Sequence, residues 1–467
     1  MPTTDMGLVA HLMRRAGFGA TYDDLSTYCE KPYQDVVEDL LHPERFPAVD
    51  DDVLRRYYLE LNNFDSYVPW QSYWIYRMIN TRRPLEEKIA LFWHQVFATS
   101  SGKSEHGPSG ATQIETFRRV GLSSLRTIYL ELARDPAMLF WLDNCENHRG
   151  EPNENWGREL LELFSMGVGN YSEQDIKMAS RAFSGWTFAQ PLPLDPYGRH
   201  TSQFQYAGQD HDDGVKTFLG QTGRFNGEDV IDIVVIQPAT SQFIARHLYN
   251  FFVADEPQVP AWGIVPPKDP AAVETLARTL RETKGDIRAC LRVLFNSVFF
   301  KNSAGKRVKS PVELVVGTVK LTGSHRFPDP GLADLAVAVA VMGQALLTPP
   351  TVEGWHTGKE WIDAGTLNER VNFAVNQLAD PQKPGVAAII AKLSGGAASL
   401  SPESFVDRCL TLAGPLSVSP ETRRGLTEHV SKGGDLKFAT DEAREESTAR
   451  AVRLLQAIVS SVEYQFA

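Results

Sequence analysis

The sequence predicts a mainly α-helical protein, with one large multi-helix body that carries a small β-rich insertion. Apolar residues recur with the 3.6-residue spacing of a helix along most of the 467 residues. Strand-like alternation is confined to one segment, about residues 186–226, and no internal repeat divides the chain. We therefore expect a helical core domain over residues 1–380 and a helical C-terminal extension over residues 381–467 packed on it.

Composition and charge narrow the range of partners. A hydrophobic content of 42% with 22% charged residues is ordinary for a globular protein. The net charge of -11 argues against nucleic acid or an anionic membrane as the main partner. The four cysteines lie far apart, which fits a reducing compartment. With no long apolar window and no secretory signal in the sequence, we expect a cytoplasmic protein without a membrane span.

Helices account for the first third of the predicted structure. They are expected at residues 6–15, 21–42, 50–63, 67–80, 84–99, 112–122, 124–134 and 136–143, with a loop over 100–110. Pro84 in the first turn, followed by Glu86 and Glu87, is typical of a helix start. The helix at 84–99 is apolar on nearly every side, which predicts that it is buried.

Further helices and the β insertion follow. Ser172 with Asp175 predicts an N-cap for a helix at 173–184. Short strands are expected within the insertion, at 186–188, 202–206 and 216–219. Helices are then expected at 228–236, 239–253, 270–283, 286–298, 310–322, 332–346 and 366–378. Ser310 and Pro311 form a favourable N-cap pair. The tail is predicted as three more helices, the last a long one from about residue 440.

The strongest candidate for chemistry is the amphipathic helix predicted at residues 153–167. Its apolar stripe consists of Trp156, Leu160, Leu163, Phe164 and Gly167. Glu159 and Glu162 fall on the flank of this stripe, where a carboxylate is costly unless it is paired. Arg158 is spaced to bridge Glu154 and Glu162. One interpretation is a structural network of arginine and carboxylates. The other is that Glu159 or Glu162 has a raised pKa and acts as an acid or a base, with Arg158, Asn153 and Asn155 binding substrate.

Histidines supply the next candidates. His94 lies in the buried helix, so it is either a core residue or a proton carrier that meets Glu159 or Glu162. His211 and Asp212 lie in the insertion and could close the site, or could simply form a turn. A divalent metal held by His94, Glu159, Glu162 and His211 is the alternative, although no cofactor is required by the sequence.

Three more side chains are candidates for substrate binding. Lys216 could bind an anionic group or lie in solvent. Trp186 and Trp355, each preceded by a glycine, could stack on a sugar ring or serve as packing anchors. The sequence lacks the nucleophile elbow, the Walker loop and the zinc-protease motif, so it gives no support to those enzyme classes.

Several phrases in order resemble the bacterial Domain of Unknown Function 1800 family, from near the N-terminus to about residue 373. They are His11 to Ala20, Phe92-Trp93-His94, Asn153-Glu154-Asn155 with Arg158-Glu159 and Glu162-Leu163-Phe164, Ser184-Gly185-Trp186, His211-Asp212 with Lys216 and Leu219-Gly220, and Gly354-Trp355 with Trp361 and Arg370. The resemblance implies a predominantly helical fold and leaves the function open. It also implies that many relatives are exported, sometimes beside a sulfatase-like partner.

The chain departs from this family pattern at one motif. Gln237 stands where the resemblance leads us to expect a histidine before Pro-Ala-Thr, and His247 stands where relatives often carry lysine. We expect an enzyme that cleaves a polar substrate, such as a carbohydrate, by hydrolytic or lyase-like acid/base chemistry. The alternatives are a metal-dependent oxidoreductase or hydrolase and a non-catalytic binding or assembly protein.

Overall fold

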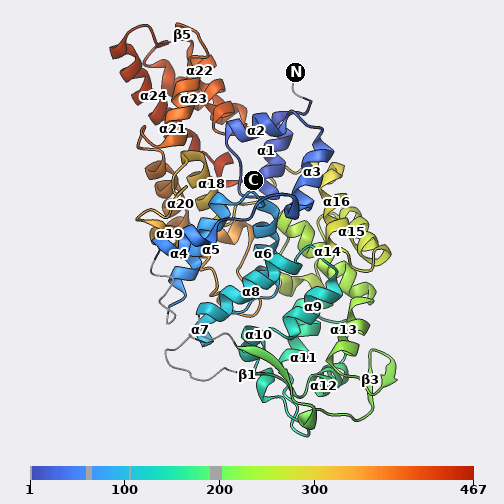
Figure 1. The fold of residues 1–467 in the computed structure, drawn as a ribbon. Helices are drawn as coiled ribbons and strands as arrows, with labels where there is room; N and C mark the ends of the chain where they lie inside the picture. The colour runs from blue at the N-terminus through green and yellow to red at the C-terminus, as the bar shows by residue number, and fades with distance from the viewer. Residues whose placement is uncertain (1–2, 59–65, 105–106, 190–201) are drawn as a thin grey trace.

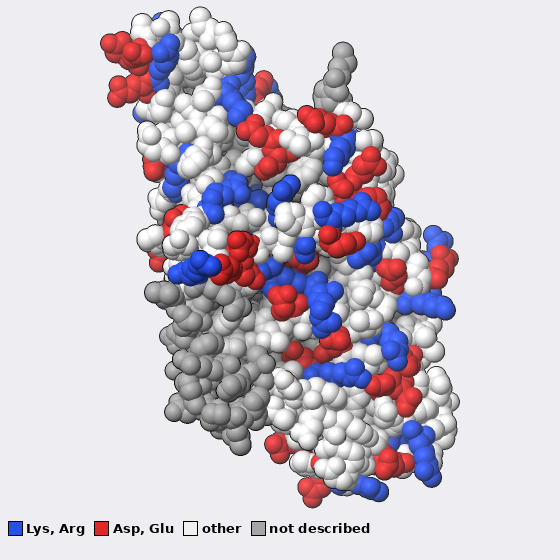
Figure 2. Space-filling model, in the orientation of Figure 1, with Lys and Arg blue, Asp and Glu red and all other residues white. Residues whose placement is uncertain are grey.

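The computed structural model of the chain describes residues 3–58, 66–104, 107–189 and 202–467. The predicted fold class is confirmed, because these residues form helices α1 to α24 with only short strand pairs. In Figure 1 the C-terminal helices occupy one end of an elongated body, and α11, α12 and the hairpin strands occupy the other. On the face drawn in Figure 2, acidic and basic side chains are interspersed.

The N-terminal third contains ten helices among the described residues. They are α1 (Met6–Arg15), α2 (Tyr22–Tyr28), α3 (Tyr33–Leu41), α4 (Asp51–Tyr57), α5 (Val68–Asn80), α6 (Pro84–Val96), α7 (Ser101–Ser104), α8 (Gly107–Val120), α9 (Leu125–Ala133) and α10 (Pro136–Trp141). The single helix expected over 21–42 is wrong, because Pro32 is the N-cap of a separate helix, α3. The end of the helix expected over 50–63 lies outside the described residues, as do 105–106 of the predicted loop.

The middle of the chain contains the candidate helix and two hairpins. Its elements are α11 (Asn155–Glu159), the π-helical η4 (Leu160–Ser165), α12 (Glu173–Ala182), β1 (Trp186–Ala189), β2 (Gln203–Tyr206), β3 (Lys216–Phe218), β4 (Gln221–Gly223), α13 (Gly227–Val235), α14 (Pro238–Phe252), α15 (Pro270–Glu282), α16 (Ile287–Asn296) and α17 (Val298–Lys301). β1 pairs antiparallel with β2, with Trp186 opposite Tyr206, and β3 pairs antiparallel with β4, with Lys216 opposite Gly223. Residues 190–201 of the predicted insertion lie outside the described part.

The C-terminal third is again helical. Its elements are α18 (Pro311–Thr322), α19 (Leu332–Val341), α20 (Ala364–Gln377), α21 (Pro384–Leu393), β5 (Ser399–Leu400), α22 (Pro402–Leu412), α23 (Pro420–Ser431), β6 (Leu436–Lys437) and α24 (Asp441–Val459). α24 packs on α20, and α21 packs on α18. The tail therefore has four helices in place of the predicted three. α19 ends at Val341, earlier than expected, and Val337 and Val341 on it are exposed.

Three helices with few exposed residues form the centre of the core. α6 is buried on nearly all sides, as its apolar pattern predicts. α14 is buried from Thr240 to Phe252 except at Gln242, and α18 is buried over most of its length. Ser310 caps α18 through the predicted capping arrangement, and Ser172 caps α12 in the same way.

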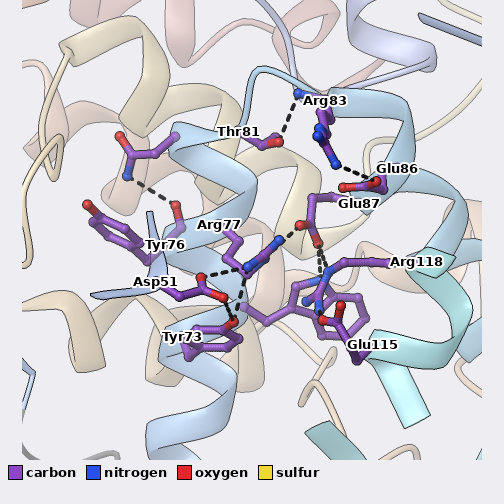
Figure 3. Close-up of polar contacts among 12 residues, drawn as sticks. Asp51, Tyr73, Tyr76, Arg77, Thr81, Arg83, Glu86, Glu87, Glu115 and Arg118 are labelled. Atoms are coloured by element: carbon purple, nitrogen blue, oxygen red, sulfur yellow. Dashed lines mark hydrogen bonds and ion pairs between the residues drawn. The ribbon is translucent and has the colours of Figure 1, made fainter. Parts of the chain in front are cut away.

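A buried glutamate ties α5, α6 and α8 together (Figure 3). Glu87 of α6 is fully buried and accepts hydrogen bonds from Arg77 Nε at 2.9 Å and Arg118 Nε at 2.8 Å. Trp74 Nε1 donates a third hydrogen bond to it at 2.9 Å. Burial alone would raise the pKa of Glu87, but the charges of Arg118 and Arg77 outweigh that effect and lower it. This carboxylate is therefore held as an anion inside the protein.

The segment after α24 returns into the core beside α18. Tyr464 OH lies 2.9 Å from Thr318 Oγ1, and the Tyr464 carbonyl accepts a hydrogen bond from Lys309 Nζ at 2.7 Å. Gln465 Oε1 accepts a hydrogen bond from Arg370 Nε at 2.9 Å. Residues 464–465 are buried, so this segment completes the interior that α18 and α20 begin.

Among the residues that the structure describes, no helix is both long enough and apolar enough to cross a lipid bilayer.

Candidate functional site

The stretch predicted as one amphipathic helix is an α-helical turn followed by a π-helical turn. α11 ends at Glu159, and η4 continues to Ser165 with a hydrogen bond from Met166 N to the Leu161 carbonyl at 3.0 Å. Because the wider turn changes the register, Leu161 is fully buried, whereas Leu163 of the predicted stripe is half-buried. π-Helical turns are rare and are found frequently at functional sites. Tyr129 OH donates to the Phe164 carbonyl within this turn at 2.7 Å.

Glu159 lies where the two helical forms join, and it is half-buried. No hydrogen bond or ion pair reaches its carboxylate from any described residue. Burial, helped by the nearby charges of Glu162 and Glu353 and opposed by that of Arg158, raises the pKa of Glu159 to about 7. Glu162 differs because it accepts a hydrogen bond from Tyr171 OH at 3.0 Å. Two neighbouring carboxyl groups therefore have unlike surroundings.

Arg158 does not make the bridge expected between Glu154 and Glu162. Its guanidinium pairs with Glu154 at 3.2 Å and with Glu173 of α12 at 2.9 Å. These pairs lie near the surface, so they fix the start of α11 against α12 without neutralising Glu159. Asn153 Oδ1 accepts a hydrogen bond from Asn155 N at 2.9 Å, and Asn155 is exposed. The two carboxamides therefore serve the helix start.

A cavity of about 80 Å³ lies beside the loop that contains Glu353. Its polar wall includes Gln95, His247, Asn250 and Glu353, with the Trp355 indole beside them. The charge of Glu353 also helps to raise the pKa of Glu159, which is not itself one of the lining residues. Burial keeps His247 neutral by lowering its pKa to about 3, and its Nε2 has no partner among the described residues.

Gly354 holds this loop against the end of α6. Its φ of +86° is in the left-handed region that favours glycine. An added Cβ would lie 2.6 Å from the Gln95 carbonyl oxygen. A side chain at this position would therefore push Glu353 and Trp355 away from the cavity.

His94 lies in the core and does not meet either glutamate. Its ring packs edge-on against Trp74 and Trp355, with centroid distances of 5.7 and 5.2 Å. Its Nε2 accepts a hydrogen bond from Leu347 N at 3.2 Å. Burial lowers the pKa of His94 to about 3, so the ring stays neutral at physiological pH. The expected pairing of His94 with Glu159 or Glu162 is not formed, and the partners of the ring are instead Trp74, Trp355 and the Leu347 backbone.

His211, Asp212 and Lys216 pack against the end of α12. His211 Nδ1 lies 3.0 Å from the Ser184 carbonyl, and Asp212 forms an ion pair with Arg181 at 2.7 Å. That hydrogen-bonded pair lowers the pKa of Asp212 to about 2. Lys216 is buried and donates to the Gly214 carbonyl at 3.1 Å and to the Asp212 carbonyl, so it is neither solvated nor free for a ligand. The structure does not bring this group to Glu159.

The two tryptophans proposed as stacking faces are both buried. Trp186 is 3% exposed and packs against Phe183 and Phe204. Trp355 is 4% exposed but lines the cavity. Of the two tryptophans, only Trp355 could touch a ligand in the cavity.

The metal alternative required His94, Glu159, Glu162 and His211 to act as one ligand set. In the described part of the chain, no three histidine, cysteine, aspartate or glutamate side chains are arranged to hold a metal ion. His94 and His211 are held by the Leu347 and Ser184 backbones, as described above, so neither histidine joins the neighbouring carboxyl groups of Glu159 and Glu162.

Sequence reasoning missed residues adjacent to those it singled out. Gln95 follows the Phe92-Trp93-His94 phrase, and Glu353 precedes Gly354-Trp355. Their polarity beside buried aromatic residues was the available signal. Tyr171 and Asn250 gave no local signal, because only folding brings them to Glu162 and to the cavity.

No curated protein and no solved structure matches this chain. One protein family matches it over residues 11–466, which includes the C-terminal helices as well as the ordered phrases up to about residue 373. The chain therefore belongs to the family described as protein of unknown function (DUF1800).

Proposed function

We propose that the protein is an acid/base enzyme that cleaves a polar substrate by hydrolysis or elimination at the Glu353 cavity. Glu159 is the proton donor and acceptor. Its raised pKa, about 7, is the observation that carries the proposal. A group whose pKa lies near the working pH is present in both protonation states, which general acid/base catalysis requires.

The neighbours of Glu159 have separate roles in this proposal. Glu162 holds the proton on Glu159 through charge repulsion, and Tyr171 OH fixes the Glu162 carboxylate at 3.0 Å. Unequal environments for two carboxyl groups support unequal roles in catalysis. Arg158 positions the start of α11 and makes no contact with substrate.

The cavity wall supports a hydroxyl-rich substrate such as a carbohydrate. Gln95, Gln258 and Asn250 supply carboxamide donors and acceptors, and Trp355 supplies an apolar surface. His247 remains neutral, so it can donate or accept one hydrogen bond without bringing charge to the site. The small cavity would hold part of one sugar ring, with the rest of the substrate lying toward exposed Glu353.

The first test measures the protonation of Glu159 directly and needs no substrate. Carboxyl carbons are labelled with ¹³C, and the signal lost in Glu159→Gln is followed by NMR from pH 4 to pH 9. We expect an inflection near pH 7. An inflection near 4.5, the ordinary value for glutamate, would overturn the proposed role.

The second test measures turnover on a panel of nitrophenyl glycosides and soluble polysaccharides. For any substrate that the parent protein cleaves, Glu159→Gln should lower kcat by about 10²–10⁴-fold, the range for loss of a general acid or base. Glu173→Gln is the matched control, since it alters an exposed partner of Arg158. Retained turnover in Glu159→Gln with an unchanged melting temperature would show that this carboxyl group is not the catalyst.

A further inference from the structure

A second cavity lies between α1, α18 and the C-terminal helices. Its volume is about 60 Å³. Much of its wall is apolar and comes from segments far apart in the sequence. These apolar residues include Ala10, Phe18, Leu25, Leu321 and Ile458.

Three cations lie in this wall, Arg14, Lys309 and Lys320, and among the described residues they donate only to neutral oxygens; Lys320 donates to the Ile79 carbonyl at 3.2 Å. Lys309 is buried, and its Nζ donates to the Tyr464 carbonyl at 2.7 Å and lies 4.0 Å from the centroid of the Tyr464 ring. Because an ammonium group has three donors, two of them have no acceptor among the described residues. Arg14 donates to the carbonyls of Gly414 at 3.1 Å and Pro415 at 3.5 Å.

The one acidic side chain in the wall, Glu313, is already occupied. Arg307 Nη1 donates to both of its oxygens, at 2.8 and 2.7 Å, and Lys88 Nζ donates to one of them. Ser310 N donates a further hydrogen bond at 2.8 Å. Glu313 therefore balances Arg307 and Lys88, and no carboxylate in the described part of the chain forms an ion pair with Lys309, Lys320 or Arg14.

The interior behind the wall adds to this positive excess. Arg15 and Arg370 are fully buried and donate to neutral oxygens, including the carbonyls of Val253 and Lys309. Nε and Nη1 of Arg15 and Nη1 of Arg370 have no partner among the described residues. Burial, together with the charges of Arg14 and Arg370, lowers the pKa of Lys309 well below its ordinary value. Buried charge of one sign is costly unless an opposite charge accompanies it.

We propose that this cavity binds a small carboxylate with a short apolar body, of about the size of butyrate. The carboxylate lies between Lys309 and Arg14 and accepts the unused donors of Lys309, and the alkyl part lies against Leu25, Leu321 and Ile458. Phosphate fits this site less well, because the apolar side of the cavity offers no donors to its remaining oxygens. Arg14 and Leu416 also line a wide surface groove of about 790 Å³, which gives the ligand a route from solvent.

Calorimetric titration of the full chain tests the proposal with three probes. We expect butyrate to bind with one-to-one stoichiometry and to raise the melting temperature, because a ligand that binds the folded state stabilises it. Butyramide, which has the same shape and no charge, should bind at least about tenfold more weakly. Equal binding of butyramide, binding of phosphate in preference to butyrate, or no binding of butyrate would each overturn the proposal.

Variants then locate the site. Lys309→Met keeps the length of the side chain but removes its charge, and it should weaken butyrate binding by at least about tenfold. Lys392→Met is the matched control, because that lysine lies on the surface of α21 and pairs with Asp23. Ala10→Val fills the cavity without altering any cation, so it should also block butyrate binding. This variant tests the site even if Lys309→Met fails to fold. Butyrate affinity unchanged in Ala10→Val would contradict the assignment.

Discussion

Glu87 and Glu159 are both glutamates of the helical body, but their surroundings shift their pKa values in opposite directions. Glu87 is fully buried and has hydrogen bonds from Arg77, Arg118 and Trp74, so its pKa is lowered. Glu159 is only half-buried and has no donor among the described residues, so its pKa rises to about 7. The difference teaches that the partners of a carboxylate, more than its depth, decide whether it stays charged.

The two sites should differ most in their contribution to stability. Glu87→Gln leaves Arg77 and Arg118 buried without their shared anion, so we expect a loss of about 3–5 kcal/mol in the free energy of unfolding at pH 7. Chemical denaturation measures this loss. Glu115→Gln removes only the exposed partner of Arg118 and should cost less than about 1 kcal/mol. Equal losses in the two variants would show that Arg77 and Arg118 do not depend on Glu87 as their buried anion.

The next effect is a loss of stability with rising pH, which the raised pKa of Glu159 predicts and the lowered pKa of Glu87 does not. Its pKa is about 7 in the folded protein against an ordinary value of 4.5, so between these values the folded state binds more protons than the unfolded state. The stability that this group contributes is therefore greatest below about pH 4.5, and it is lost as pH rises through about 7.

Glu159→Gln removes this dependence. Relative to the parent, the variant should gain on the order of 2 kcal/mol between pH 5 and pH 8, after allowance for the part of the side chain that stays in water. Unfolding free energies of both proteins at these two pH values give the difference. A stability difference that is the same at pH 5 and pH 8 would contradict the raised pKa.

The smallest effect concerns Arg158. Its ion pairs with Glu154 and Glu173 are partly exposed, so Arg158→Gln should cost less than about 0.5 kcal/mol in stability. The same change should raise the pKa of Glu159 further, because the Arg158 charge lowers it. Carboxyl NMR detects that shift, and Arg119→Gln, which removes a surface pair with Glu131, is the control. A fall in the Glu159 pKa would be the opposite of this expectation.

Much of the fold could be predicted because its helices carry local signals. The continuous apolar character of α6 and the caps at Ser172 and Ser310 depend on residues a few positions apart, which sequence patterns record directly. Departures from a regular α-helix were harder to predict. The π-helical turn at Leu160–Ser165 has an ordinary helical composition, and its register follows from packing.

The candidate site was predicted only in part, because side-chain partners are settled in three dimensions. Spacing along one helix suggested that Arg158 would reach Glu162, but folding brings Glu173 of α12 closer. Spacing also could not show that Trp355 fills the space beside His94, or that Arg181 would bind Asp212. Glu159 was identifiable as a candidate because a carboxylate at the edge of an apolar stripe is unusual wherever its partners lie.

The return of residues 464–465 into the core has a consequence for the order in which the protein is made. Lys309 and Arg370 donate hydrogen bonds to the backbone carbonyl of Tyr464 and to the side-chain oxygen of Gln465. At roughly 5–20 residues per second, these acceptors leave the ribosome about 20–90 s after α1. Throughout that interval residues 464–465 do not yet cover the interior beside α18. The surfaces that they cover in the folded protein are therefore open to water and to other chains. The interior beside α18 is therefore closed by a segment that is synthesised long after the helices it covers.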